Sequence, residues 1–211
     1  MMTMKITDLS LTYTEGMAGV SFETARTKLK DGWNAKTLHL YSHAGTHMDA
    51  PFHFDVNDQT IDEFEVSRFV CNAWVITVQA YSMQKIKKSD LGRFVDLIGE
   101  GDGVVLKTGW SQFVHEDRYR NELPGIHEDL ANWFVQKKIN MLAVEPPSIA
   151  DVNDLQEVTK IHEILLGGDI IIVEGITNLE AISSEKIRLV ALPLKIKDGD
   201  GAPARVIAME E

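Results

Sequence analysis

The chain has 211 residues, of which 44% are hydrophobic and 25% are charged. This composition argues against a disordered chain, and the length suits one domain with a sizeable core. The 21 Lys and Arg residues are outnumbered by 32 Asp and Glu residues, so the formal net charge is −11. Such a charge disfavours nucleic-acid binding and docking on an anionic membrane. We therefore expect a single domain over residues 1–211 whose partners are neither nucleic acids nor membranes.

The cysteine count and the first residues bear on the cellular compartment. Cys71 is the only cysteine, which excludes an internal disulfide and a Cys-rich zinc site. The N-terminal residues lack a basic region followed by an apolar stretch, so we expect no signal peptide. The longest apolar runs fall far below the roughly 20 residues that span a bilayer. These features favour a cytoplasmic protein.

The first third of the chain is expected to contain mostly strands and loops. Residues 6–12 and 36–42 alternate between apolar and polar side chains, and the second segment places Leu38 and Leu40 on one face. Residues 73–78 are rich in β-branched side chains, which favours a further strand.

From residue 89 onward, predicted helices alternate with predicted strands. In chain order we expect a helix over 89–97, strand 104–108, helix 126–138, strand 141–144, helix 154–166, strand 170–174 and a hairpin of 190–197 with 204–209. The glycines at 167 and 168 are the stop signal expected after a helix. Helices interleaved with strands indicate a mixed α/β protein.

The histidines are concentrated in one short stretch. Four of the 7 histidines fall within fifteen residues. The stretch holds four potential metal ligands at intervals of four, two and four residues: His43, His47, Asp49 and His53. In an extended chain these positions would share one face. Imidazole nitrogen and carboxylate oxygen are donors for zinc, manganese or ferrous iron, so we predict a metal site here. His39, within a regular predicted strand, is assigned no such role.

Two further potential ligands lie in the second half of the chain. On a helix, His162 shares a face with Val158 and Leu165 and therefore points into the interior. Glu174 ends a buried apolar strand, where a carboxylate is costly unless it is paired, protonated or bound to metal. Asp49 could bridge two ions through its two oxygens, the usual arrangement for activating a water molecule. We therefore predict a second ion beside the first.

The sequence blocks around these residues are similar to those of a known family. Residues 43–54 read His-Ala-Gly-Thr-His-Met-Asp-Ala-Pro-Phe-His-Phe, which resembles the H-x-G-T-H-x-D-x-P-x-H signature of the metal-dependent cyclase family. That family includes bacterial kynurenine formamidase and isatin hydrolase. Further blocks that resemble the family are 108–110, 147–149, 162–167, 173–179, 192–194 and 200–205.

The resemblance implies a ligand set, a fold and an assembly. It implies five ligands for two ions with Asp49 shared: His43 and His47 for the first ion, His162 and Glu174 for the second. His53 is implied as a general acid/base beside the metals. Zinc or manganese, two ions per chain, is implied as the cofactor. A swivelling β/β/α-type fold and a homodimer or homotetramer are also implied.

The expected activity is hydrolysis of a small amide, formamide or lactam by a metal-activated water. Conversion of N-formylkynurenine to kynurenine in tryptophan catabolism is the example from the family. His53, whose ordinary pKa of about 6.5 suits acid/base work near neutrality, would donate a proton to the leaving nitrogen.

Two alternatives remain open from the residues alone. His47 and Asp49 with a distant histidine, His115 or His127, could form the iron site of a mononuclear oxygenase. The metal could also be purely structural or serve partner binding, in a closed tetrahedral site without catalysis.

Overall fold

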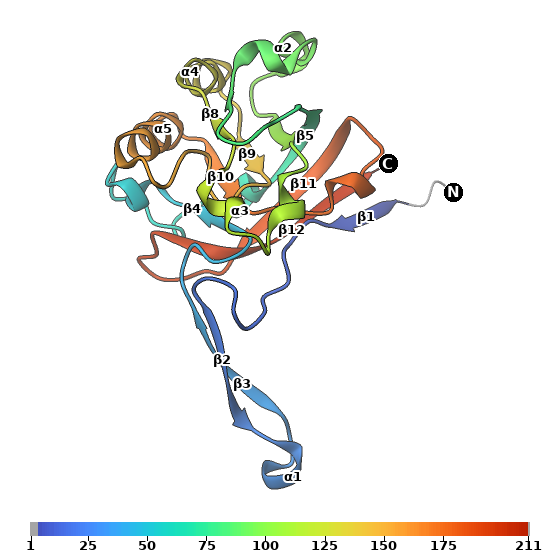
Figure 1. Ribbon diagram of the computed structural model, residues 1–211, viewed down its shortest axis with the longest axis vertical. Helices are drawn as coiled ribbons and strands as arrows, with labels where there is room; N and C mark the ends of the chain where they lie inside the picture. The colour runs from blue at the N-terminus through green and yellow to red at the C-terminus, as the bar shows by residue number, and fades with distance from the viewer. Residues whose placement is uncertain (1–3, 211) are drawn as a thin grey trace.

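A closed β-barrel forms the centre of the molecule (Figure 1). The structure, a computed structural model, describes residues 4–210. An eight-stranded sheet runs in the order β1-β12-β11-β5-β7-β9-β10-β4, and β4 pairs back onto β12 to close the ring. The strands are β1 (Lys5–Asp8), β4 (His47–Asp49), β5 (Val70–Thr77), β7 (Gly103–Lys107), β9 (Met141–Val144), β10 (Ile171–Glu174), β11 (Lys186–Pro193) and β12 (Gly201–Glu210).

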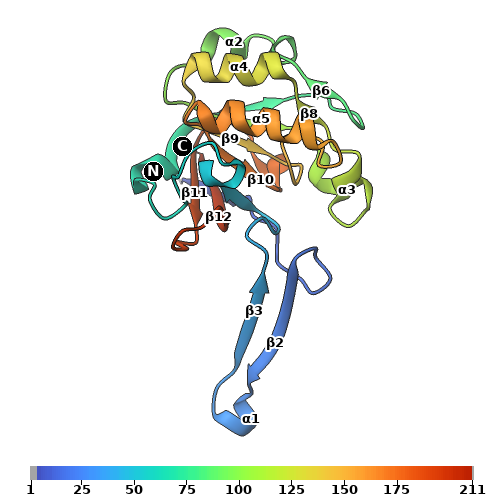
Figure 2. The same cartoon turned by 90° about the vertical axis from the view of Figure 1, so that its left-hand side faces the viewer.

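One side of the barrel is covered by helices. Strands β5, β7, β9 and β10 are parallel neighbours, and parallel strands need crossover connections, which usually contain a helix. The connections contain α2 (Phe94–Leu97), α3 (Arg118–Asn121), α4 (Glu128–Lys137) and α5 (Leu155–Gly167). Figure 2 shows α4 and α5 side by side over the barrel. The mixed α/β class predicted from the sequence is confirmed. Within the described residues, no helix is long and apolar enough to cross a membrane.

Two hydrophobic cores lie on opposite faces of the same strands. Because side chains alternate along a strand, Val105 and Ala143 point into the barrel, while Val104 and Leu142 pack toward the helices. The barrel interior contains many alanines, which suits strands that approach closely across a narrow interior. The helix layer packs against the second core, which includes Phe134.

The alternation on β4 decides where its polar side chains lie. Met48 is fully buried in the barrel interior. Its neighbours His47 and Asp49 therefore point to the outer face, toward α5. Directly across from His47 on β10 is Glu174, so the outer face of these two strands carries three buried polar side chains.

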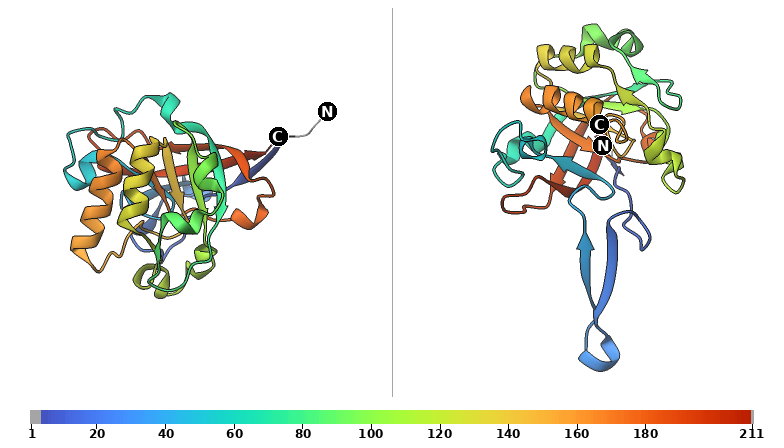
Figure 3. Two further views of the ribbon diagram at one scale, coloured as in Figure 1. Left: turned by 90° about the horizontal axis from the view of Figure 1, so that it is seen from above. Right: turned by 60° about the vertical axis from the view of Figure 1, so that its left-hand side comes forward.

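The N-terminal part forms an arm that leaves the barrel. Strands β2 (Val20–Arg26) and β3 (Ala35–Leu40) pair only with each other, and the short helix α1 (Lys28–Asp31) lies at their tip. Figures 1 and 3 show this hairpin projecting from the side opposite the helices. A smaller pair, β6 (Lys85–Ile86) with β8 (Gly125–Ile126), lies beside the helix layer.

Several predicted elements are confirmed. The strand over 141–144 has the expected bounds, and the C-terminal hairpin is formed by β11 and β12. The last helix begins directly after Asp154, whose carboxylate accepts a hydrogen bond of 3.0 Å from the backbone N–H of Glu157. This N-cap satisfies one of the free donors of the first turn.

Two helix predictions are wrong in detail. The helix expected over 89–97 is divided into the 3₁₀ turn η3 (Lys88–Leu91) and α2, because Gly92 has a φ of +54° that a right-handed helix does not accommodate. The helix expected over 126–138 starts later, since the ring of His127 caps its first turn and the preceding residue belongs to β8.

Glu210 at the end of β12 ties the barrel to neighbouring segments. Its buried carboxylate accepts hydrogen bonds from the N–H and hydroxyl of Ser183 and from the N–H of Ser184, and it lies 2.8 Å from the ammonium of Lys5. The Lys5 ammonium is the main cause that holds the pKa of Glu210 well below its usual range, although burial opposes it.

We expect Glu210→Gln to lower the free energy of unfolding at pH 7 by about 1–3 kcal/mol, because hydrogen bonds to a charged acceptor are lost. The lowered pKa means that this contribution is complete above the unfolded-state pKa of about 4.3 and disappears as the pH falls through the folded-state value. Urea unfolding at several pH values tests this. Glu185→Gln, which removes only an exposed pair with Arg93, is the control; an equal loss in both variants would contradict the prediction.

Candidate metal centre

Five of the six predicted site residues lie on β4, β10 and α5 or in the turn that precedes β4. β4 supplies His47 and Asp49, β10 supplies Glu174, and α5 supplies His162 from its buried face. The turn before β4 supplies His43. The sixth residue, His53, lies on the 3₁₀ helix η1 (Pro51–Phe54) that follows β4.

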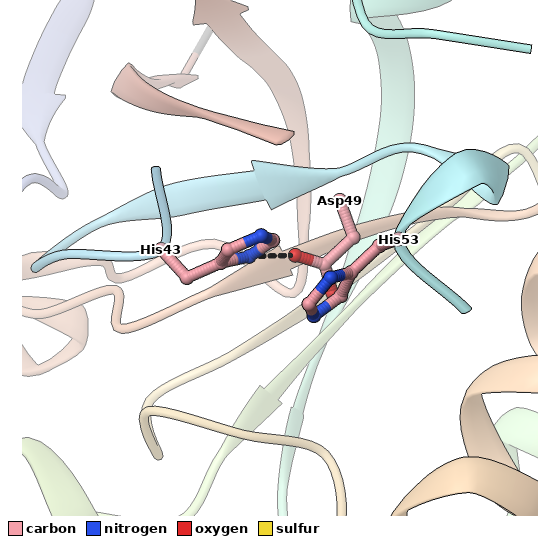
Figure 4. Close-up of side chains that lie close together, drawn as sticks. All are labelled: His43, Asp49 and His53. Atoms are coloured by element: carbon pink, nitrogen blue, oxygen red, sulfur yellow. Dashed lines mark hydrogen bonds and ion pairs between the residues drawn. The ribbon is translucent and has the colours of Figure 1, made fainter. Parts of the chain in front are cut away.

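The side chains converge on the outer face of the barrel. The Nε2 atom of His47 lies 3.1 Å from Oε2 of Glu174. The Nε2 atom of His162 lies 3.5 Å from Oε1 of Glu174 and 3.6 Å from Oδ2 of Asp49. Figure 4 shows His43 pointing at Asp49, with Nδ1 to Oδ1 at 2.8 Å. Residues far apart in the sequence are thus brought into one buried cluster.

The convergence was predicted, but the reason given for it was wrong. A single extended segment does not run from His43 to His53, because only the three residues of β4 are extended. Gly45 turns the chain before β4 with a φ of +60°. Pro51, which suits the first turn of a helix, begins η1 after it. His43 and His53 reach the cluster because the chain turns at both ends of β4, and their rings stack at 3.8 Å between centroids.

The backbone fixes which nitrogen of two histidines faces the cluster. Nδ1 of His47 donates to the carbonyl of Gly45 at 3.0 Å, and Nδ1 of His162 donates to the carbonyl of Val158 at 2.7 Å. A carbonyl oxygen can only accept a hydrogen bond, so both rings carry a proton on Nδ1. When the ring is neutral, Nε2 therefore has a free lone pair that can bind a metal. Metal-binding histidines are typically oriented in this way.

The donor set fits a cation. Among the described residues, Oδ2 of Asp49 is buried without any hydrogen-bond partner, a costly state unless a positive charge faces it. Two groups of three potential ligands meet at this residue: His43, Asp49 and His53, and His47, Asp49 and Glu174. Asp49 is common to both groups, but the groups divide the other residues differently from the ligand sets that the resemblance implies. His53 falls in the first group, whereas the resemblance implies a role for it in acid/base chemistry.

The pKa shifts within the cluster also favour a bound cation. Burial by itself lowers the pKa of His43, but hydrogen bonds and charges from Asp49 and Asp200 outweigh it and raise that pKa to about 9. Burial raises the pKa of Asp49, yet His43 above all holds it below its usual range. Imidazolium protons therefore balance the buried carboxylates. A divalent cation can replace these protons, so metal binding should release them.

Asp200 belongs to the site and was not predicted. Its Oδ2 accepts a hydrogen bond of 2.8 Å from Nε2 of His43 and lies 3.6 Å from Nδ1 of His53. The sequence suggested only a turn between two strands. The turn reaches the site because β12 pairs with β4, placing Gly201 opposite Asp49. A Cβ on Gly201 would lie 2.7 Å from the His43 ring, so this approach requires glycine.

A cavity of about 680 Å³ opens above the cluster. Its floor is made by the histidines of the site and Glu174, while residues 14–19 and 114–121 contribute its walls. Met17, Val114 and Val152 add apolar surface, and Arg120 adds a positive charge. The site is therefore reachable by a small molecule.

Glu145 holds one wall of the cavity in place. Its buried carboxylate accepts hydrogen bonds from the N–H of Thr108, the N–H of Gly109 and the hydroxyl of Ser111, at 2.5–2.7 Å. Its backbone carbonyl accepts a bond of 2.8 Å from the hydroxyl of Tyr119. These bonds fix η4 (Trp110–Phe113) and the wall that follows it. The sequence contained this acidic residue, but its partners could not be read from spacing.

The two candidates for the distant histidine of the oxygenase alternative lie outside the cluster. His127 caps α4 and pairs with Asp129 at 2.5 Å, beside a different surface pocket. His115 is exposed on the cavity wall. Within residues 4–210, neither belongs to a group able to hold a metal.

Comparison with known proteins identifies the family. The family model described as putative cyclase matches residues 7–151. The kynurenine formamidase of Bacillus cereus is 30% identical over 188 residues, which cover 89% of this chain and 86% of that protein. The chain belongs to the putative cyclase family. Such relatives confirm the expected enzyme class, a hydrolase of non-peptide C–N bonds. They favour this class over the oxygenase and the non-catalytic alternatives.

Solved structures share the fold of this cyclase-family member. A protein described as a potential metal-dependent hydrolase with cyclase activity is 26% identical, with a TM-score of 0.80 and 99% of each chain covered. Isatin hydrolase A from Ralstonia solanacearum is 21% identical, with a TM-score of 0.85 over 99% of this chain and 92% of that one; it supports the fold. Together with the donor set, the first of these supports a divalent metal as cofactor.

We expect Asp200 to increase the affinity for the metal, although it contacts the cluster only through His43 and His53. Outer carboxylates that orient histidine ligands typically contribute about 10–100-fold to metal affinity or activity. We expect Asp200→Asn to weaken binding of zinc by about tenfold or more, measured by competition with a chelating dye. Asp198→Asn, in the same turn but exposed and 3.8 Å from Lys197, is the matched control. Equal affinity in the two variants would refute the role.

Proposed function

We propose that this cyclase-family protein hydrolyses the C–N bond of a small amide, formamide or lactam, as an arylformamidase-like enzyme. The observation that carries the proposal is the buried Asp49, with one oxygen unpartnered, at the centre of a cluster that opens into a cavity. A closed structural site would have no such access. The named relatives, a kynurenine formamidase and isatin hydrolase A, support this class of substrate.

The cofactor proposed is a pair of zinc or manganese ions per chain. His43 and His47 would serve one ion, His162 and Glu174 the other, and Asp49 both. When bound, such ions supply an activated water at neutral pH and polarise the carbonyl oxygen of the substrate. The protein's part is to fix these donor atoms, which the backbone bonds of His47 and His162 do before any ion arrives.

His53 is placed to move a proton. Its ring is partly buried, stacks on His43 and faces the cavity. Burial is the first cause that lowers the pKa of His53 below its usual value, so the neutral ring predominates at pH 7. Nδ1 faces Asp200, which leaves Nε2 to take a proton during attack and give it to the leaving nitrogen. The departing amine is thereby neutral.

The cavity walls suit a small, partly apolar substrate. Met17 and Val114 offer apolar contact, and Arg120 and His115 offer polar contact at the same opening. An aryl formamide combines a flat apolar ring with a reactive amide. Conversion of N-formylkynurenine to kynurenine is one reaction of this class that the site would accommodate.

Metal content tests the proposed pair of ions. Elemental analysis of the purified protein should give near two equivalents of zinc or manganese per chain. Asp49→Asn should lose most of both, because Asp49 is shared by the two groups. Glu145→Gln is the matched control, since it alters an equally buried carboxylate that bonds only to the protein. One equivalent of metal that survives the loss of Asp49 would contradict the shared site.

Turnover of an aryl formamide tests His53. General acid/base catalysis typically contributes about 10²–10⁴-fold, so we expect His53→Gln to lower kcat by that order with the metal content unchanged. His127→Gln, at the N-terminus of α4, should keep wild-type turnover. If a panel of formamides, lactams, amides and esters gives no turnover with metal-loaded wild type, the proposed function is wrong. If His53→Gln keeps full turnover, only its assigned role is wrong.

A further inference from the structure

The short turn between His43 and His47 determines where both of these histidines point. It consists of Ala44, Gly45 and Thr46, and Gly45 has a φ of +60°. The carbonyl of Gly45 accepts a hydrogen bond of 3.0 Å from Nδ1 of His47. Because this bond aims Nε2 of His47 at the cluster, any contact that orients the turn also orients this ring.

A tyrosine from the N-terminal part of the chain holds the turn. The hydroxyl of Tyr13 lies 2.9 Å from the carbonyl oxygen of Ala44 and 3.1 Å from that of Thr46. A phenol has one proton to donate, so the carbonyls on the two sides of Gly45 share it. Burial raises the pKa of Tyr13 to about 12, so the hydroxyl keeps its proton near neutral pH. Tyr13 therefore bonds to the turn on both sides of Gly45.

The two carbonyls do not depend on this hydroxyl equally. The Thr46 carbonyl also accepts a hydrogen bond of 2.9 Å from the backbone N–H of Ala204. Among residues 4–210, the carbonyl of Ala44 accepts a hydrogen bond only from Tyr13. Ala44 is buried, and a buried carbonyl without a donor is unfavourable. Removal of the hydroxyl would therefore favour a different orientation of the turn directly after His43.

The ring of Tyr13 packs against the turn independently of its hydroxyl. A Cβ on Gly45 would lie 2.9 Å from Cε1 of Tyr13 and 3.3 Å from the sulfur of Met17. The ring is thus in direct contact with the backbone of Gly45, which leaves no room for a side chain there. Tyr13→Phe would keep this packing and remove the hydrogen bonds alone.

A second contact ties the same N-terminal segment to the turn and to the end of β10. The backbone N–H of Leu11 donates to the hydroxyl of Thr46 at 2.8 Å, and that hydroxyl donates to the carbonyl of Gly175 at 2.6 Å. Gly175 directly follows Glu174, a predicted ligand. Residues 11–13 supply no ligand themselves, yet they hold together two elements that do.

We propose that Tyr13 is a positioning residue of the metal centre, whose hydroxyl holds the turn that presents His43 and His47 to an ion. The inference rests on the metal centre of the proposed function and not on the identity of the substrate. Groups that orient metal ligands typically contribute about 10–100-fold to metal affinity or activity. Tyr13 acts on His47 through the carbonyl of Gly45, so the lower end of this range is expected.

Zinc affinity, measured by competition with a chelating dye, is the first test. We expect Tyr13→Phe to bind zinc about tenfold more weakly than the wild type. Tyr119→Phe is the matched control, because its buried hydroxyl also donates to a backbone carbonyl, that of Glu145, at 2.8 Å. Both variants lose a bond of the same kind, so thermal unfolding should show similar destabilisation. Only Tyr13→Phe should lose affinity for zinc.

Two further measurements report on the geometry of the turn. Cobalt(II) in place of zinc absorbs visible light with bands that depend on the arrangement of its ligands. At saturating cobalt, Tyr13→Phe should shift or weaken these bands, and Tyr119→Phe should reproduce the wild-type spectrum. Without metal, hydrogen exchange reports local opening, so a peptide covering residues 43–49 should exchange faster in Tyr13→Phe than in Tyr119→Phe.

Two results would overturn the positioning role while leaving the proposed reaction intact. One is a zinc affinity and a cobalt spectrum of Tyr13→Phe equal to those of the wild type. The other is an equal loss of affinity in Tyr119→Phe, which would trace the effect to general stability. A wild type that binds neither zinc nor cobalt would refute the metal centre and this role together. Failure of the proposed reaction shows differently, as a metal-loaded wild type without turnover.

Discussion

The pairing of β4 with two strands at once is the constraint on which the rest of the structure depends. Only three residues long, β4 closes the barrel by bonding to β10 on one side and β12 on the other. That closure buries Met48 inside and turns His47 and Asp49 outward. It also places Glu174 across from His47 and the turn containing Asp200 beside the cluster. The candidate metal centre is thus a consequence of how the sheet closes, and disrupting either pairing would separate the residues of the cluster.

The residues of the centre could be predicted from the sequence, but their arrangement could not. The spacing from His43 to His53 indicated candidate ligands because four potential metal-binding side chains in so short a stretch rarely arise without a cation. Their real geometry depends on turns at Gly45 and Pro51, which local patterning did not weigh. Asp200 was missed because its role exists only once β12 meets β4, a contact across more than 150 residues. Long helices and buried strands, whose patterns are local, were predicted well.

The arm illustrates the same limit of local patterning. β3 was recognised from the alternation around Leu38, whereas its partner β2 was not predicted, since Thr24, Ala25 and Arg26 interrupt its alternation and a register shift falls there.

The buried polar cluster on the barrel lowers the stability of the fold. Buried carboxylates balanced by imidazolium protons stabilise a fold less than an apolar cluster of the same volume would. A bound cation, absent from the unfolded chain, stabilises the folded state by mass action.

The walls of the cavity are built from segments that take no part in closing the barrel. Residues 14–19 and 114–121 are connections, and Glu145 ties the second of them to the end of β9 through its hydrogen bonds. Connections of this kind tolerate insertion and replacement far better than strands do. The residues at the floor of the cavity and those of its walls can therefore change independently during evolution. A lineage can change which molecule it accepts through these two segments while the reaction stays the same.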